Sequence, residues 1–220
     1  LAHLVATRST QTNEIGRCAV LWPALTVMAA GRGIDAVALL DFGCSAGLNL
    51  GVDGYGYDYG ALSLGSPEPR APRIACRIVG GRPLQAGASP PRVVQRLGID
   101  PAPIDVHDEA QVAWLRACLW PGDRERLARL DAAVAIACHA RWPVQRHADC
   151  TAAIEPWLDG LPAGVLPVVL SSFVLMYFDR PAQQRIVGPV DRGHAARAEQ
   201  PQIAVASEAG ARISVTSLPD

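Results

Sequence analysis

Residues 39–50, with the sequence LLDFGCSAGLNL, constrain the fold more than any other stretch of the chain. An apolar run ends in Asp41 and is followed by a turn of small residues that includes Gly43, Ser45 and Gly47. A buried strand that turns directly into a helix leaves backbone N–H groups facing an open crevice, where they bind a ligand or hold a nucleophile. Two chemistries fit this pattern: a nucleotide-type cofactor site and the nucleophile elbow G-x-S-x-G.

Size and charge narrow the classes to which the chain can belong. A chain of 220 residues, half of them hydrophobic, has enough apolar surface for one sizeable core, so we expect a single domain over residues 1–220. The net charge of −1 gives no electrostatic reason to expect a nucleic acid or a membrane as partner, which leaves a small molecule as the expected substrate. All 20 basic residues are arginine, so Schiff-base and P-loop lysines are excluded.

The six cysteines are scattered, with no C-x-x-C pair and no accompanying histidine spacing, so the sequence predicts no metal site. Cysteines on apolar faces are typical of reduced proteins. Because the chain also has no signal peptide and no apolar run approaching ~20 residues, we expect a cytoplasmic protein. The chain starts at Leu1 rather than Met, which predicts a fragment or a processed product.

Residues 1–33 are predicted to form an N-terminal helical segment. Apolar residues recur at helical spacing up to about residue 30, with Ser9 or Thr10 as the expected N-cap. Pro23 lies inside this pattern and is expected to kink or split the helix. The polar start, TRSTQTNEIGR, is either a solvated first turn or part of a pocket wall beside the central turn. The residues of that wall would be Thr12, Asn13, Glu14 and Arg17.

Apolar strands alternate with helical segments along the rest of the chain. The predicted strands cover residues 34–42, 93–99, 144–148, part of 165–178, 203–208 and 213–216. The predicted helices cover residues 48–52, 109–120, 124–139, 151–158 and 183–190. This alternation predicts an α/β protein with a Rossmann-like, mostly parallel sheet and helices on both faces.

Residues 53–92 interrupt the alternation and are predicted to be an insertion. Tyr55, Tyr57 and Tyr59 alternate with glycine and aspartate, and a proline-rich bend separates them from a second alternating segment at residues 73–79. We expect a β-hairpin with loops. The tyrosines are expected to form one packed face of a strand rather than a platform for stacking a substrate.

An acid or a hydroxyl follows most of the predicted strands. The carboxyl ends of the strands in an open parallel sheet border the ligand crevice. A nucleoside bound there would find acids beside both its ribose and its base. The residues at these positions are Asp41, Asp100, Asp149, Ser171, Ser172 and Glu208.

Five segments in a fixed order give the chain a family resemblance. They are TRSTQTNEIGR, LLDFGCSAGLNL, RLGIDPAPIDV, WLRACLWPGDRERLARLDAAV and VVLSSFVLMYF. The chain resembles, over most of its length, the bacterial family catalogued as domain of unknown function 2332. The resemblance implies a fold similar to that of class I S-adenosylmethionine-dependent methyltransferases, with S-adenosylmethionine as cofactor. Family members carry an additional N-terminal helical region, so we expect this chain to be truncated at its N-terminus.

The resemblance implies roles for residues at three strand ends. Asp41 and the glycines after it match the motif that holds the methionine end of the cofactor, with Ser45 in place of the usual middle glycine. Asp100 resembles the ribose-binding acid, and Asp149 the acid near the adenine. The pattern of acids and hydroxyls at strand ends adds Ser171, at the end of the fourth strand. The predicted cofactor-binding residues are Asp41, Gly43, Ser45, Gly47, Asp100, Asp149 and Ser171.

Methyl transfer requires in-line positioning of the acceptor against the sulfonium, and a base where the acceptor loses a proton. The sequence does not rank the candidate bases. SSFVLMY stands in place of the N-P-P-Y signature of nucleic-acid amino-methyltransferases, which argues against DNA adenine methylation. The candidate bases are Glu14, Asp105, His107 and Tyr177.

The main alternative is a serine hydrolase. Residues 43–47 match G-x-S-x-G completely, with Ser45 as nucleophile, and Asp149 and His194 follow in hydrolase order. Against this alternative, Asp41 lies close to where an oxyanion would develop, and His194 lies in a polar segment. A nicotinamide dehydrogenase has less support, because the spacing is not G-x-G-x-x-G. A non-catalytic domain that binds a nucleoside or a partner protein stays open.

Overall fold

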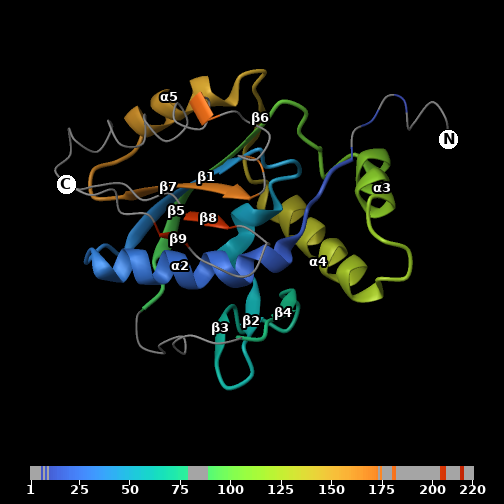
Figure 1. Ribbon diagram of the computed structural model, residues 1–220, viewed down its shortest axis with the longest axis horizontal. Coiled ribbons are helices and arrows are strands. Elements are labelled where there is room, and N and C mark those ends of the chain that lie inside the picture. Colours follow the sequence, from blue (N-terminus) through green and yellow to red (C-terminus); the bar gives the residue numbers. More distant parts are fainter. Residues whose placement is uncertain are drawn as a thin grey trace.

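The structure is a computed structural model that describes residues 6, 8, 10–78, 89–172, 174, 180–181, 204–206 and 214–215. Within these residues the central sheet has six strands in the order β6-β5-β1-β7-β8-β9 (Figure 1). Counted along the chain, this order is 3-2-1-4-5-6, that of doubly wound dinucleotide-binding folds. The prediction of a Rossmann-like sheet is confirmed. The strands are β1 (Ala36–Phe42), β5 (Arg92–Asp100), β6 (Val144–Arg146), β7 (Leu166–Ser172), β8 (Ala204–Ala206) and β9 (Ser214–Val215).

The strand pairing makes the sheet mostly parallel, as predicted. Strand β1 pairs in parallel with β5 and β7, β5 with β6, and β7 with β8, whereas β9 is antiparallel to β8. All seven residues of β1 are buried, which is expected for a central strand with both faces covered. The strand order changes direction between β1 and β7, and folds of this kind bind ligands beyond the carboxyl ends of such strands.

Helices cover both faces of the sheet (Figure 1). Alternate residues of β1 belong to two separate apolar cores, because successive side chains of a strand point to opposite faces. Val37 and Leu39 pack in the core that contains α2 (Cys18–Gly31) and α4 (Arg124–Ala140). The other face packs against η3 (Cys150–Ala153) and α5 (Ile154–Asp159). Helix α3 (Glu109–Ala117) precedes α4, and the 3-10 helix η2 (Leu48–Gly54) replaces the weak helix predicted after the central turn.

The N-terminal helical segment begins later than predicted and is not split. Residues 10–13 are not helical, and the first turn is η1 (Ile15–Arg17), where the Glu14 carboxylate accepts a hydrogen bond from Gly16 N at 2.7 Å. Helix α2 continues through Pro23, which has no N–H to donate to the carbonyl of Ala19. The Tyr59 hydroxyl donates to that carbonyl instead, at 2.5 Å. A side chain of the insertion thus completes the hydrogen bonding of the helix at Pro23.

The insertion forms a small sheet of three strands in the order β3-β2-β4. Strands β2 (Gly56–Asp58) and β4 (Arg73–Ala75) lie in the two segments predicted to form the hairpin, but they pair in parallel. The antiparallel partner of β2 is β3 (Ser63–Gly65), which was not predicted. The small sheet lies on the side of α2 away from the central sheet (Figure 1). Tyr55 and Tyr57 are fully buried, which confirms the packed face. Their hydroxyls donate to the carbonyls of Leu48 and Val52 in η2, at 2.6 and 2.5 Å.

The strands predicted at residues 203–208 and 213–216 are present as the shorter β8 and β9. The helix predicted at residues 183–190 and the acid Glu208 lie outside the described residues. In the part of the chain that the structure describes, no helix combines the length and apolar character needed to cross a bilayer.

Candidate functional site

The turn after β1 has an unusual backbone. Gly43, Ser45 and Gly47 have positive φ angles of 71°, 53° and 68°. Glycine adopts this left-handed conformation without steric cost, whereas another residue is strained in it by about 1–2 kcal/mol. A Cβ at Gly43 would also lie 2.5 Å from Val174 Cγ2, and one at Gly47 would lie 2.7 Å from Val144 Cγ2. The two glycines are therefore required by conformation and by space, and Ser45 needs other contacts to hold it.

Two side chains supply those contacts. Asp100 Oδ2 accepts a hydrogen bond from Ser45 N at 2.8 Å, and its Oδ1 accepts one from Ala102 N at 2.8 Å. Asn13 Oδ1 accepts from Ala46 N at 3.1 Å, while Asn13 Nδ2 donates to Ser45 Oγ at 2.7 Å. Asp100, the acid predicted to bind a ribose, thus holds the turn in place. The side-chain amide of Asn13, in the N-terminal segment, holds it from the other side of the sequence.

The turn does not offer its backbone N–H groups to a ligand. The N–H groups of Gly43 and Cys44 donate to the carbonyl of Ile99 at 2.8 and 3.1 Å, and Gly47 N donates to the carbonyl of Cys44 at 2.8 Å. Together with the bonds to Asp100 and Asn13, every N–H from residue 43 to residue 47 has an acceptor in the protein. The prediction of N–H groups facing an open crevice is wrong, because the turn itself, the end of β5 and the N-terminal segment accept all of them.

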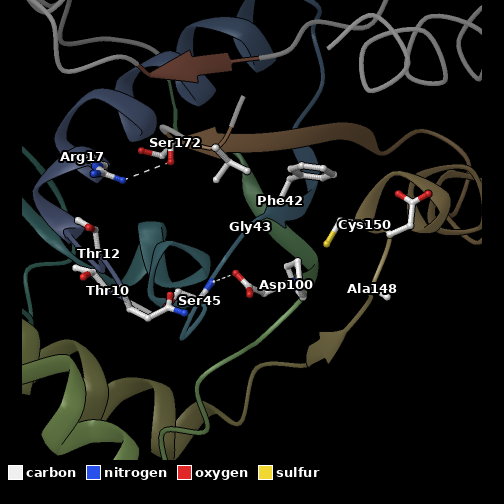
Figure 2. A pocket seen from close by; sticks show the side chains of 14 residues that line it. Thr10, Thr12, Arg17, Phe42, Gly43, Ser45, Asp100, Ala148, Cys150 and Ser172 are labelled. Atoms are coloured by element: carbon white, nitrogen blue, oxygen red, sulfur yellow. Dashed lines mark hydrogen bonds between the residues drawn. The ribbon is translucent and has the colours of Figure 1, made fainter. Parts of the chain in front are cut away.

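A cavity of about 630 Å³ lies beside the turn, at the carboxyl ends of β1, β5, β6 and β7 (Figure 2). This is the edge of the sheet at which doubly wound folds bind ligands. The volume is within the range of small-molecule sites. The lining residues are Thr10, Gln11, Thr12, Arg17, Phe42, Gly43, Ser45, Asp100, Pro101, Ala148, Asp149, Cys150, Ser172 and Val174.

The N-terminal segment forms a polar wall of this cavity. Thr12 and Arg17 line it, so the interpretation of the polar start as a pocket wall is confirmed for these two residues. The Arg17 guanidinium donates to the carbonyl of Ser172 at 3.5 Å, which links the segment to the end of β7 (Figure 2). Asn13 is not in the wall but holds the turn. The segment therefore both shapes the cavity and positions the central turn.

Asp41 is buried next to the cavity rather than in its lining. The residue is 1% exposed, while the two residues that follow it line the cavity. Burial raises the pKa of Asp41 to about 7; a hydrogen bond from Asn49 opposes this rise, and the negative charge of Asp100 adds to it. Asp41 Oδ2 has no hydrogen-bond partner in the described structure. The site thus contains a buried acceptor without a donor.

The two serines at the end of β7 lie on opposite faces of the sheet. Ser171 alternates with Leu170 and shares the face of Val169, whereas Ser172 shares the face of Leu170 and lines the cavity. Both hydroxyls are buried, and neither has a hydrogen-bond partner in the described structure. The cofactor-binding prediction names Ser171, but Ser172 is the serine that reaches the cavity, because neighbouring residues of a strand point in opposite directions.

The end of β6 contributes Asp149 and Cys150 to the wall. Asp149 is the N-cap of η3, and its Oδ1 accepts a hydrogen bond from Thr151 N at 2.9 Å. Burial, together with the charges of Asp100 and Asp149, raises the pKa of Cys150 to about 11, so its thiol is protonated at neutral pH. All six cysteines are free, and within the described ranges no group of three His, Cys, Asp or Glu side chains could hold a metal ion.

The candidate bases that the structure describes do not lie in this cavity. Glu14 forms ion pairs with Arg126 Nε at 2.5 Å and with Arg129 at 3.7 Å, which direct its carboxylate toward α4. Asp105 and His107 are exposed and line a second cavity of about 340 Å³ on the α4 side of the turn. Tyr177 lies outside the described residues.

The geometry does not supply the parts of a serine hydrolase. The oxyanion donor of a nucleophile elbow is the N–H of the residue after the nucleophile, and here Ala46 N is bonded to Asn13 Oδ1. Ser45 Oγ accepts from Asn13 rather than bonding to a base. No hydrogen bond joins Ser45 to a histidine in the described ranges, and His194 lies outside them.

Sequence reasoning missed several residues of the wall, among them Phe42, Cys150 and Val174. Phe42 is the last residue of β1, Cys150 begins η3 after β6, and Val174 comes two residues after the end of β7. Their apolar or thiol side chains, however, gave no chemical signal of a site. A rule that takes the last residue of each strand and the two residues after it, whatever their chemistry, would have found Phe42 and Val174.

Residues 1–217 match a single family profile, described as "Uncharacterized protein conserved in bacteria (DUF2332)". The chain belongs to this family. No curated protein matches this DUF2332 chain. Two similar solved structures are the medium-resolution structure of the bifunctional kinase-methyltransferase WbdD and the crystal structure of monomeric WbdD. Both are 12% identical, with TM-scores of 0.36 and 0.34, and the matches cover 93% and 96% of this chain. This chain spans 34% and 36% of the length of those two chains.

Proposed function

We propose that the protein is an S-adenosylmethionine-dependent methyltransferase acting on a small-molecule acceptor. The observation that carries the proposal is the cavity at the strand ends, which has carboxylates from two neighbouring strands, Asp100 and Asp149, in its wall. An acid at the end of the second strand of a doubly wound fold accepts hydrogen bonds from a ribose. The next acid along the sheet would then lie on the base side of the nucleoside.

The amino-acid end of the cofactor would be held on the other side of the turn. Asp41 Oδ2 is a buried acceptor without a donor, which suits an ammonium group. Arg17 places a guanidinium in the cavity wall, and a guanidinium suits a carboxylate. The residues present therefore fit a nucleoside that carries a zwitterionic amino acid.

When bound, S-adenosylmethionine supplies a methyl group activated by its sulfonium. The contribution of the protein is position and the exclusion of water, since methyl transfer needs no covalent enzyme intermediate. Phe42 and Val174 give the cavity an apolar surface, and the N-terminal segment gives it a polar one.

The proposal includes a small-molecule acceptor rather than a nucleic acid or a membrane, in keeping with the net charge of −1. A cytoplasmic location is part of the same proposal, in keeping with the six free cysteines.

Calorimetric titration with S-adenosylmethionine and S-adenosylhomocysteine tests the proposal. We expect both to bind the parent chain, and Asp149→Asn to weaken binding by about tenfold or more, because a hydrogen bond to a charged group is lost. Asparagine is as good an N-cap as aspartate, so η3 should persist. The matched control is Asp159→Asn, at the exposed end of α5 outside the cavity.

Two results would overturn the proposal. The first is the absence of binding by the parent chain at millimolar concentrations of either ligand. The second is covalent labelling of Ser45 by a fluorophosphonate, which would favour the hydrolase.

A further inference from the structure

The central turn has one donor left for a ligand, and it is a side chain. The five N–H groups from residue 43 to residue 47 all donate to acceptors within the protein. Ser45 lines the cavity and is 5% exposed. Its hydroxyl is therefore the group of the turn that can donate a hydrogen bond to a bound molecule.

The direction of the Ser45 hydroxyl proton follows from its neighbours. Backbone Ala46 N can only donate, so the atom of Asn13 that it meets at 3.1 Å must be the carbonyl oxygen Oδ1. The other end of the same amide, Nδ2, therefore faces Ser45 Oγ at 2.7 Å and donates to it. Ser45 Oγ uses a lone pair in this bond, and its own proton has no acceptor among the described residues.

The backbone of Ser45 gives an independent reason to look for a role. Its φ of 53° lies in the left-handed region, where glycine would be unstrained. Residues held in such conformations are concentrated at functional sites, where neighbouring contacts over-determine them. Asp100 and Asn13 provide these contacts, and both belong to other parts of the chain. A serine kept at this cost, whose proton has no acceptor among the described residues, indicates recognition of a ligand atom.

We infer that Ser45 Oγ–H is a ligand-binding donor that recognises an acceptor oxygen of the bound nucleoside amino acid, and that Asn13 is the positioning residue that orients this proton. The inference rests on the proposed function. The acceptor oxygen is either a carboxylate oxygen of the amino-acid end or a ribose oxygen, since both classes of oxygen accept from a hydroxyl.

Two substitutions at Ser45 separate recognition from stability. Ser45→Gly removes the hydroxyl and relieves the left-handed strain, so we expect the unfolding temperature to stay near that of the parent while affinity for S-adenosylhomocysteine falls about tenfold or more. Ser45→Thr keeps the hydroxyl but places a β-branched residue at positive φ, so we expect a lower unfolding temperature with affinity retained. A serine with only a structural role would make affinity follow stability in both variants.

A third variant tests the direction of the proton. In Asn13→Asp the carboxylate still accepts from Ala46 N, but it cannot donate to Ser45 Oγ and instead accepts the Ser45 proton. We expect a loss of affinity similar to that of Ser45→Gly with the turn still clamped. The control is Ser63→Asp, which adds the same charge at an exposed residue of β3 outside the cavity wall and leaves the Asn13 amide in place.

The oxygen is identified by titrating each variant with S-adenosylhomocysteine and with 5′-methylthioadenosine, which keeps the ribose but lacks the amino-acid end. Loss of affinity for the first ligand alone assigns the carboxylate, and equal loss for both assigns the ribose. If the parent binds both ligands and Ser45→Gly binds them equally well, the inference is overturned and the proposed function stands. If the parent binds neither ligand, the proposed function fails and the inference fails with it.

Discussion

The insertion and the strand ends of the central sheet both bury polar oxygens, but in opposite hydrogen-bonding states. In the insertion, each of three tyrosine hydroxyls donates to a backbone carbonyl at 2.5–2.6 Å. At the ends of β1 and β7, three buried side chains each keep an oxygen without a hydrogen-bond partner in the described structure. The paired groups are Tyr55, Tyr57 and Tyr59, and the unpaired groups are Asp41, Ser171 and Ser172.

This difference separates polar groups that stabilise the fold from polar groups that are available to a ligand. A buried hydroxyl that donates to a carbonyl stabilises the fold by about 1 kcal/mol, and its removal leaves the carbonyl unsatisfied. A buried acceptor without a donor destabilises the protein unless a ligand supplies the missing group. Substitutions in the insertion should therefore lower stability, and substitutions at the strand ends should preserve or raise it while reducing binding.

The largest expected effect is at Asp41. Its pKa is about 7 in the folded protein and 3.8 in the unfolded chain, so between these values the unfolded state binds fewer protons and stability falls as the pH rises. The difference corresponds to roughly 4 kcal/mol, lost between about pH 4 and pH 7 and constant above. Asp41→Asn removes this titration and should be more stable than the parent by a large part of that amount at pH 8, with little difference at pH 4. Urea unfolding at both pH values measures it.

The control for Asp41→Asn is Asp53→Asn, whose carboxylate forms a half-buried ion pair with Arg96 at 2.5 Å. That substitution should destabilise the protein at pH 8 rather than stabilise it. Asp41→Asn should also abolish binding of S-adenosylhomocysteine if the carboxylate holds an ammonium. If Asp41→Asn is less stable than the parent at pH 8 and still binds S-adenosylhomocysteine, the strand ends do not differ from the insertion in the way described.

The second effect is at Tyr57. Burial raises the pKa of its hydroxyl, which therefore remains a donor, and it bonds to the carbonyl of Val52. Tyr57→Phe should lower the free energy of unfolding by about 1–3 kcal/mol, because the carbonyl loses its donor. Chemical denaturation measures the loss. Binding of S-adenosylhomocysteine should not change, since Tyr57 is not part of the cavity wall. A ligand-specific effect would contradict the assignment of the insertion to structure.

A smaller effect is the coupling between Tyr59 and Pro23. Tyr59→Phe should cost about 1 kcal/mol in the parent, because the carbonyl of Ala19 then has neither the hydroxyl nor a helical N–H. In the Pro23→Ala background the restored N–H can bond to that carbonyl, so the same substitution should cost clearly less. A double-mutant cycle measures the coupling. Additive costs would show that the hydroxyl does not replace the missing N–H.

The smallest expected effects on stability are at the two serines of β7. Ser171→Ala and Ser172→Ala each remove a buried, unpaired hydroxyl, so both should leave stability unchanged or raise it by up to about 1 kcal/mol. Only Ser172→Ala should weaken ligand binding, because only Ser172 lines the cavity. Thermal unfolding measures the stability of both variants, and calorimetry measures their ligand affinity. Each variant is the control for the other. A weaker ligand complex in Ser171→Ala would assign a role to the opposite face of the sheet.

Much of the fold follows from local pattern. The apolar run before Asp41 predicts β1, which begins at Ala36 rather than at residue 34, and the helical spacing of residues 124–139 predicts α4 almost to its ends. The errors occur where a distant group changes the local preference. Helix α2 continues through Pro23, and Tyr59 supplies the missing donor to the carbonyl of Ala19, from which it is 40 residues away. The hairpin partner of β2 was also predicted wrongly: the alternating residues 73–79 contribute β4, which pairs with β2 in parallel, and the antiparallel partner is β3.

The sequence by itself determined the strand, the turn and the alternation that place a site after Asp41, because these depend on the periodicity of neighbouring residues. Only the tertiary structure decided what the turn can do. Asn13 and Asp100 lie 32 and 55 residues from Ser45, and their hydrogen bonds occupy N–H groups that the local pattern left free. Hydrogen bonds over such separations depend on how the elements pack, so the one donor left for a ligand, the Ser45 hydroxyl, could not be identified from the sequence.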